Sequence, residues 1–154
     1  MWKVVVAILN FWLTSSIAFH DFLHRFRAGS GTVTVNFKAK LLQQLAALRE
    51  EVLYVIFLDL QKSYDALDRS ICLEILEGYG VGPQLCSLLQ KYWSWLRMVS
   101  KAGGYYGAVF KGARGVKQGD LLSPTIFNVV VDAVVQHWVT MMVEIAEERD
   151  GRGQ

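Results

Sequence analysis

The pattern of hydrophobic and polar positions predicts a chain of helices interrupted by a few short strands. Apolar residues recur at helical spacing in several stretches, and glycine-rich segments separate them. The expected helices cover residues 2–14, 36–51, 66–77, 83–99 and 124–147. A loop is expected around residues 28–32, and a polar, glycine-containing tail at 148–154 should be frayed.

Two further stretches predict strands. Residues 53–58 form a nearly continuous run of β-forming apolar residues bounded by charges, which is typical of a strand buried on both faces. After a break at Gly103-Gly104, residues 105–116 predict a hairpin around Gly112. Strands interleaved with helices indicate an α/β or α+β fold in which helices pack on a small sheet.

The N-terminal apolar run, residues 4–13, allows two interpretations. After Lys3 it imitates the apolar region of a signal peptide, with Ser16 and Ala18 as small residues near a possible cleavage point. Asn10 interrupts the run, which is too short and too polar to span a membrane. We interpret it as a core helix and expect an intracellular location, cytoplasmic or with a nucleoprotein, and no membrane partner. A secreted α/β protein stays open as an alternative.

Composition and charge narrow the function classes. A chain of 154 residues suffices for one domain, and its 53% hydrophobic content excludes disorder for most of it. Residues 1–49 carry six lysines and arginines against one acid, and residues 91–119 carry six more and no acid. Seven acidic residues lie between Glu50 and Glu77. This order would suit a polyanion held beside a metal site, and solvated faces of amphipathic elements explain it equally well.

The strongest candidate chemistry lies in a polar loop and at one strand end. Gln118-Gly119 stands just before the last predicted helix, where Ser123 should be the N-cap and Pro124 the first helical residue. Folding alone would not require the Gln-Gly pair there. Asp59 ends the buried strand, a position at which a sheet holds a carboxylate rigidly and exposes it.

Three motifs resemble those of the reverse transcriptases of non-LTR retroelements and group II introns. The first, Asp59-Leu60-Gln61-Lys62-Ser63-Tyr64-Asp65, resembles motif A, and Gln118-Gly119 with Ser123-Pro124-x-x-Phe127-Asn128 resembles motif B. Upstream, residues 23–32 look like the fingers motif of these enzymes. The resemblance covers residues 2 to about 140. It implies an α+β fingers and palm fold for residues 1–147, fingers-like at 1–51 and palm-like at 52–147.

The resemblance also implies an activity, RNA-directed DNA synthesis on an RNA template with a DNA primer and deoxynucleoside triphosphates. Asp59 would be the catalytic aspartate and one ligand of a two-Mg²⁺ site. The backbone amide of Leu60 would face the triphosphate, and Tyr64 would lie beneath the sugar as a steric gate against ribose. Gln118 would contact the incoming nucleotide.

Two other residues take implied roles. Gly119 would let the backbone approach the nucleotide, because glycine has no Cβ. Arg27 would contact a phosphate of the template or primer.

One part of the family pattern is missing from this sequence. Reverse transcriptases supply further metal ligands from a hairpin that reads aromatic-x-Asp-Asp, and this sequence contains no Asp-Asp pair. We therefore expect a fragment with an incomplete palm and no thumb, inactive by itself. A non-catalytic remnant that binds nucleic acid through the two basic zones stays open as a second hypothesis.

Overall fold

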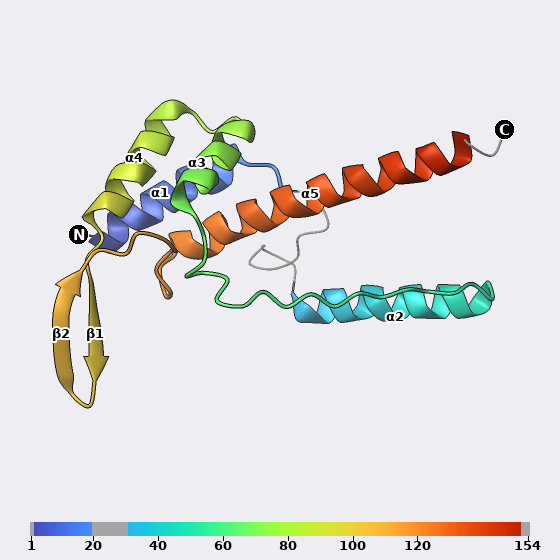
Figure 1. The fold of residues 1–154 in the computed structure, drawn as a ribbon, viewed down its shortest axis with the longest axis horizontal. Coiled ribbons are helices and arrows are strands. Elements are labelled where there is room, and N and C mark those ends of the chain that lie inside the picture. The colour runs from blue at the N-terminus through green and yellow to red at the C-terminus, as the bar shows by residue number, and fades with distance from the viewer. Residues whose placement is uncertain (1, 20–30, 152–154) are drawn as a thin grey trace.

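The computed structural model describes residues 2–19 and 31–151 (Figure 1). The described part is mostly helical and has one two-stranded antiparallel sheet, which is compatible with the α+β class. Its elements are α1 (Trp2–Ser16), α2 (Thr32–Leu48), α3 (Arg69–Gly78), α4 (Pro83–Trp95), β1 (Met98–Ala102), β2 (Tyr105–Phe110) and α5 (Leu122–Gly151). All five predicted helices are present, with shifted ends.

Four helices enclose one apolar core: α1, α3, α4 and the first turns of α5 (Figure 1). The residues that α1 buries there, Val6, Leu9 and Leu13, recur every three or four positions, as an amphipathic helix requires. The N-terminal apolar run is therefore a core helix in this structure. Its other face stays exposed, with Phe11 66% accessible.

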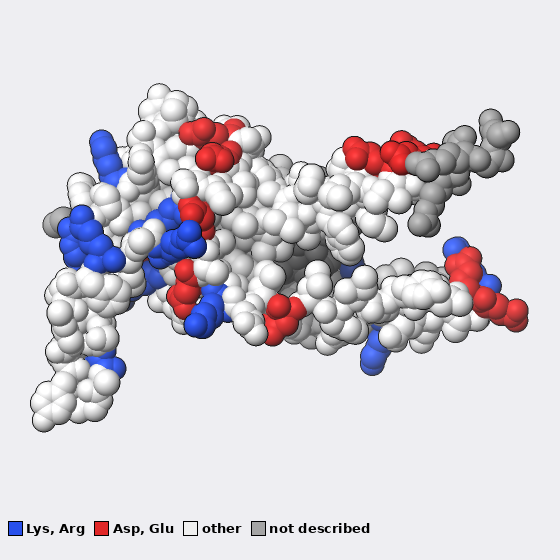
Figure 2. Space-filling model, viewed as in Figure 1, with Lys and Arg blue, Asp and Glu red and all other residues white. Residues whose placement is uncertain are grey.

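The hairpin β1–β2 projects from the helices, and Lys and Arg side chains gather where it leaves them (Figures 1 and 2). Its turn is Gly103-Gly104, and both glycines have positive φ, 58° and 86°, as a two-residue type I′ turn requires. The prediction of a hairpin around Gly112 was therefore wrong. Helix α4 was also predicted too long, because the chain leaves it at Leu96 to enter β1.

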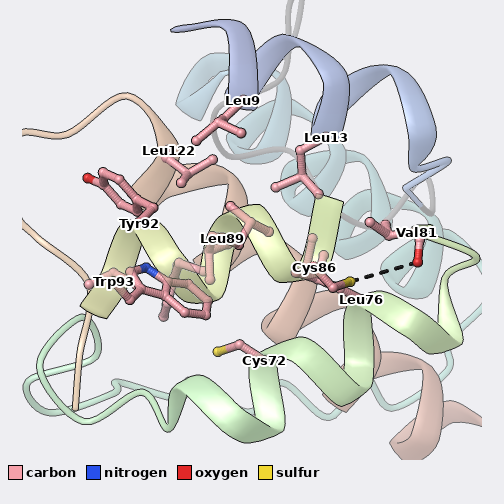
Figure 3. Packing of buried hydrophobic residues seen from close by; sticks show 14 of the residues in the cluster. Leu9, Leu13, Cys72, Leu76, Val81, Cys86, Leu89, Tyr92, Trp93 and Leu122 are labelled. Atoms are coloured by element: carbon pink, nitrogen blue, oxygen red, sulfur yellow. Dashed lines mark hydrogen bonds between the residues drawn. The ribbon is translucent and has the colours of Figure 1, made fainter. Parts of the chain in front are cut away.

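Helices α3 and α4 complete the core: they contact each other, and α4 also contacts α1 (Figure 3). Leu76 and Leu89 have no exposed surface. Both cysteines are free and buried here, and burial raises the pKa of the Cys72 thiol to about 11. In the described part no helix packs against the sheet: each strand pairs with the other strand, and the contacts between helices and other regular elements are all with other helices. The expectation of helices packed on a small sheet was wrong.

The predicted buried strand does not form. Residues 51–60 have no regular secondary structure and are all exposed, with Phe57 91% accessible. A buried strand needs neighbouring strands to take its backbone hydrogen bonds. In the described residues the two strands pair with each other, so this apolar segment has no sheet to enter. Among the described residues, helix α2, which precedes this segment, contacts no other helix or strand and has no buried residue.

Helix α5 is longer than predicted. It begins at Leu122, so that Ser123 lies inside the first turn and not at the N-cap, and it continues through Gly151 into the predicted polar tail. Its segment Leu122–Glu148 is long and apolar enough to cross a membrane, and 28% of its most apolar window is buried. The buried positions lie in the first turns, where Ile126 and Val129 enter the core. A core helix of a soluble protein has the same length and composition.

Candidate functional site

Two segments that are distant in the sequence are joined by backbone hydrogen bonds. The N–H of Gly115 donates to the carbonyl of Leu67 at 2.7 Å, and the N–H of Val116 donates to the carbonyl of Tyr64 at 2.9 Å. The segment after Asp59 and the loop that carries Gln118 therefore lie side by side. This contact brings the two motifs together without a sheet.

Gly115 allows this contact for two reasons. Its φ is +79°, a conformation that L side chains rarely adopt. A Cβ at this position would lie 2.9 Å from three backbone atoms, the Cα and carbonyl oxygen of Asp65 and the carbonyl oxygen of Tyr64. Sequence reasoning assigned no role to Gly115, because these partners come from a distant segment.

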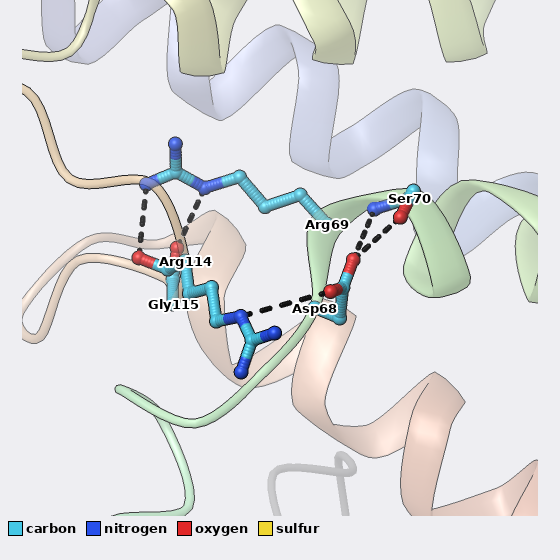
Figure 4. A network of polar contacts seen from close by, with 5 residues as sticks. All are labelled: Asp68, Arg69, Ser70, Arg114 and Gly115. Atoms are coloured by element: carbon cyan, nitrogen blue, oxygen red, sulfur yellow. Dashed lines mark hydrogen bonds and ion pairs between the residues drawn. The ribbon is translucent and has the colours of Figure 1, made fainter.

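Arg69, in the first turn of α3, holds the same loop (Figure 4). Its Nε donates to the carbonyl of Gly115 and its Nη1 to that of Gly112, both at 2.8 Å. The neighbouring Asp68 caps α3 by accepting from the N–H of Ser70 at 3.0 Å. Sequence reasoning missed this arginine too, since no local pattern shows which carbonyls a guanidinium will meet.

Beside this junction lies a cleft of about 700 Å³. It is lined by Tyr64 from the motif A segment, by Gln118 and Gly119 from the loop, and by residues of α1 and α5. The full set is Asn10, Thr14, Tyr64, Gln118, Gly119, Asp120, Leu121, Ser123, Pro124 and Thr125. Three of the predicted nucleotide-binding residues therefore share one cavity.

The cleft walls are fixed by side-chain contacts. The Tyr64 ring stacks on Phe127 of α5, with ring centroids 5.1 Å apart. Ser123 Oγ donates to the carbonyl of Lys117 at 2.6 Å, which ties the loop to the start of α5. Thr125 Oγ1 donates to Asn10 Oδ1 at 2.6 Å and so links α5 to α1. These contacts hold in place the segments that carry Tyr64 and Gln118.

Asp120, which also lines the cleft, accepts a hydrogen bond from the hydroxyl of Tyr92 on α4. The pKa of Tyr92 is raised, mainly because the phenol is buried and further because it donates to a carboxylate. A second phenol, that of Tyr79, donates to the buried carboxylate of Asp132 at 2.6 Å, and its pKa is raised for the same reasons.

These phenols predict a loss of stability in alkali. A phenol whose pKa is higher in the folded state stabilises the fold fully below its unfolded pKa of about 10, and this contribution is lost as the pH rises toward the folded pKa. We expect the free energy of unfolding, measured in urea, to fall above about pH 10. Tyr92→Phe should reduce this pH dependence, whereas Tyr105→Phe, at an 83% exposed position, should leave it unchanged. If the free energy of unfolding depends on pH in the same way for Tyr92→Phe and wild type, the Tyr92 phenol does not cause the loss of stability in alkali.

Two other predicted residues lie elsewhere, and one cannot be placed. Asp59 and Leu60 are exposed on the irregular segment and do not line the cleft. Arg27 lies outside the described residues. The catalytic and binding roles of these residues therefore stay predictions.

The described residues do not fit a two-Mg²⁺ centre. Two ions about 4 Å apart need several converging carboxylates. Within residues 2–19 and 31–151, no group of three or more histidine, cysteine, aspartate or glutamate side chains could hold a metal ion. Asp59 does not line the cleft that Asp120 lines, and the carboxylate of Asp120 already accepts from Tyr92.

Comparison with protein families decides what the motifs mean. A family model described as reverse transcriptase (RNA-dependent DNA polymerase) matches residues 2–146. The chain belongs to the reverse transcriptase family. The match includes the cleft residues, the Arg69 contact and the exposed segment around Asp59. The resemblance drawn from the three motifs is confirmed.

The curated relatives of this reverse transcriptase chain are Pol polyproteins of R2 elements. The chain is 32% identical over 83 residues to the Pol polyprotein of the type-2 retrotransposable element R2DM of Drosophila melanogaster. This alignment covers 54% of the chain and 8% of the relative. The chain is 33% identical over 95 residues to that of the type-1 retrotransposable element R2 of Nasonia vitripennis, covering 59% and 9%. The aligned part is thus a small share of each relative. No solved structure matches the chain.

Proposed function

We propose that this chain supplies the part of an RNA-directed DNA polymerase that holds the incoming deoxynucleotide. One observation carries the proposal: Tyr64 and Gln118-Gly119 come from separate motifs of a reverse transcriptase chain and line one cleft. A volume of about 700 Å³ is within the range of small-molecule sites. Template RNA, a DNA primer and an intracellular location belong to the same proposal.

Each cleft residue takes a role that its chemistry permits. The flat ring of Tyr64, supported by Phe127, would lie beneath the sugar and leave no room for a 2′-hydroxyl. Gln118 has an amide that can donate to and accept from the nucleotide. Gly119 has a φ of +82° and no atom within 4 Å of its missing Cβ, so the loop offers open space beside its backbone.

The described residues do not support metal chemistry. The family generally uses Mg²⁺, and Asp59 is the motif A aspartate that would bind it, with the Leu60 amide next to the triphosphate. In this structure Asp59 is exposed, and among residues 2–19 and 31–151 no cluster of carboxylates around it could hold two ions. We therefore expect the chain alone to bind nucleotide without extending a primer.

The cleft predicts nucleotide binding that depends on Tyr64. We expect calorimetry to detect binding of a deoxynucleoside triphosphate and weaker binding of the matching ribonucleotide. Tyr64→Ala should remove this preference, and Gln118→Ala should weaken binding about tenfold through one lost hydrogen bond. The matched control is Tyr105→Ala, which removes an exposed ring outside the cleft.

Two results would contradict the proposal. One is the absence of nucleotide binding by the folded wild-type chain, and the other is binding that Tyr64→Ala and Gln118→Ala leave unchanged. A separate assay addresses catalysis. Primer extension with Mg²⁺ that Asp59→Asn abolishes would show that the isolated chain is active, against our expectation.

A further inference from the structure

The second half of helix α5 is exposed on every side. Each residue from His137 to Glu148 is exposed, whereas the first turns of the same helix enter the core. Figure 1 shows this half extending beyond the other core helices. Its large apolar side chains are Trp138, Val139, Met141, Met142, Val143 and Ile145. A helix that is apolar around most of its surface is normally buried against another element.

Four of these side chains form a stripe along one face of α5. Trp138, Met141, Met142 and Ile145, which we call the α5 stripe, stand at positions i, i+3, i+4 and i+7. This is the spacing of the anchor residues of a helix that docks in a groove. Residues 137–148 also contain three glutamates and no lysine or arginine. Figure 2 shows acidic side chains gathered near the end of this helix.

A groove of matching form lies between α1 and α4. This α1–α4 groove has a volume of about 290 Å³, and the buried residues Leu9 and Tyr92 lie at its floor. Each helix lines it with four residues at the same i, i+3, i+4 and i+7 spacing: Val5, Ile8, Leu9 and Trp12 from α1, and Leu88, Lys91, Tyr92 and Trp95 from α4. A third helix packs between two helices when its ridge of side chains fills such a groove.

The charge of the groove is opposite to that of the second half of α5. Lys91 lines the groove, and Lys3 lines an adjoining hollow on α1 that shares two lining residues with it. Helices α1 and α4 contain no aspartate or glutamate. The groove therefore suits an acidic helix. Helix α2 is a poor occupant, because it carries Lys38 and Lys40 and no acid.

A single copy cannot bring these two surfaces together. The first turns of α5 are fixed in the core, where Ile126 is buried. Because an α-helix rises about 1.5 Å per residue, Met142 stands about 24 Å along the axis from Ile126. To reach the groove of its own chain, α5 would have to break and turn back. It contains no glycine or proline between Pro124 and Gly151 that would favour such a break.

We propose that two copies of this chain form a dimer in which the α5 stripe of each copy docks in the α1–α4 groove of the other. The glutamates beside the stripe then lie near Lys91 and Lys3. Each copy offers one stripe and one groove, so an exchange about a two-fold axis uses both surfaces and closes the assembly. The proposal does not depend on nucleotide binding, because neither surface includes a residue that lines the nucleotide cleft.

The apolar part of the contact is tested by sedimentation equilibrium of the full chain. We expect a dimer that Trp138→Ala with Met142→Ala weakens about a hundredfold, since two anchors are lost. Both positions are exposed within one copy, so circular dichroism should show a wild-type fold. The matched control is Phe37→Ala with Leu42→Ala, which trims exposed apolar side chains on α2 and should leave the dimer unchanged. A monomeric wild type, or equal losses from the two pairs, would overturn the proposal.

The charge complementarity is tested by reversing charges on both surfaces. Lys3→Glu with Lys91→Glu should weaken the dimer about tenfold, and Glu144→Lys with Glu148→Lys should do the same, because each pair places like charges in contact. The chain that carries all four changes should recover most of the wild-type affinity. A combined variant that loses as much as both pairs together would show that these surfaces do not face each other.

A mixing experiment tests the exchange itself. Leu88→Glu places a carboxylate in the groove and leaves the α5 stripe intact, whereas Trp138→Ala with Met142→Ala leaves the groove intact. Each variant alone should be largely monomeric. An equimolar mixture should contain more dimer than either variant, because one stripe then meets one intact groove. A mixture with no more dimer than the separate variants would contradict the exchanged arrangement.

A last measurement distinguishes a second copy from a lipid surface, since α5 has the length and composition of a membrane span. We expect the wild-type chain to stay in the aqueous fraction when it is floated with phosphatidylcholine vesicles. Flotation with the vesicles that is lost in Trp138→Ala with Met142→Ala would assign the α5 stripe to a membrane and overturn the dimer.

Discussion

Replacing Gly115 by alanine is expected to destabilise the chain by about 3 kcal/mol or more. Two costs add at this position. The φ of +79° is unfavourable for any residue with a Cβ, and the added atom would lie 2.9 Å from three backbone atoms of Tyr64 and Asp65. Backbone atoms cannot move aside as a flexible side chain would, so the contact between the motifs must open. Urea unfolding followed by circular dichroism measures the loss.

The matched control is Gly119→Ala in the same loop. Gly119 has nearly the same φ, +82°, but a Cβ there would meet no atom within 4 Å. Alanine at position 119 should therefore cost only the conformational part, about 1 kcal/mol. The difference between the two variants isolates the close approach at Gly115. Equal losses would show that the approach of the two segments does not require glycine.

Replacing Gly115 should also disturb the cleft. Val116 is bonded to the carbonyl of Tyr64, so opening the junction moves Tyr64 away from Gln118. We therefore expect Gly115→Ala to weaken nucleotide binding in calorimetry as well. The measurement is made below the unfolding transition, so that unfolded protein does not account for the change.

The helices were predictable because their signals are local. The apolar spacing of α1 and the glycines after α3 lie within each segment's own sequence. The hairpin was predicted at the wrong turn, although Gly103-Gly104 carries a strong type I′ signal. The chain break expected there was in fact the turn that joins β1 to β2.

The strand at residues 53–58 failed for a different reason. Its composition is that of a buried strand, but burial and pairing are supplied by other segments, and no described strand is available to it. The predicted position of Asp59 at a rigid strand end depended on that sheet and failed with it. A sequence pattern states what a segment can pack against, and the rest of the fold decides whether that partner is present.

The cleft was predicted in part. Tyr64, Gln118 and Gly119 came from motifs, and the structure brings them together. Gly115 and Arg69 hold the motifs in contact, and sequence reasoning gave neither residue a role. Both residues contact backbone atoms of a distant segment, and because backbone atoms are the same in every residue, the sequence does not reveal these contacts. Only the structure shows them.

The second large effect is expected for Arg69→Met, which keeps an extended apolar side chain and removes the guanidinium. It should cost about 2–3 kcal/mol of unfolding free energy, because the carbonyls of Gly112 and Gly115 lose a charged donor at 2.8 Å. Arg69→Lys should recover only part, since an ammonium lacks the fixed fork that reaches both carbonyls. The measurement is again urea unfolding.

The control for Arg69 is Arg114→Met in the same network. The Arg114 side chain is 71% exposed and its Nε lies 3.8 Å from Oδ2 of Asp68, so loss of this ion pair should cost less than about 1 kcal/mol.

The decisive comparison is a double-mutant cycle of Arg69→Met with Gly115→Ala. Arg69 donates to the carbonyl of Gly115, so once alanine has displaced that loop the arginine has less to hold. The two losses should therefore sum to more than the double variant loses, by about 1 kcal/mol. Additive losses would mean that Arg69 stabilises α3 and Trp93, whose ring lies 6.0 Å from its guanidinium, and not the junction between the two motifs.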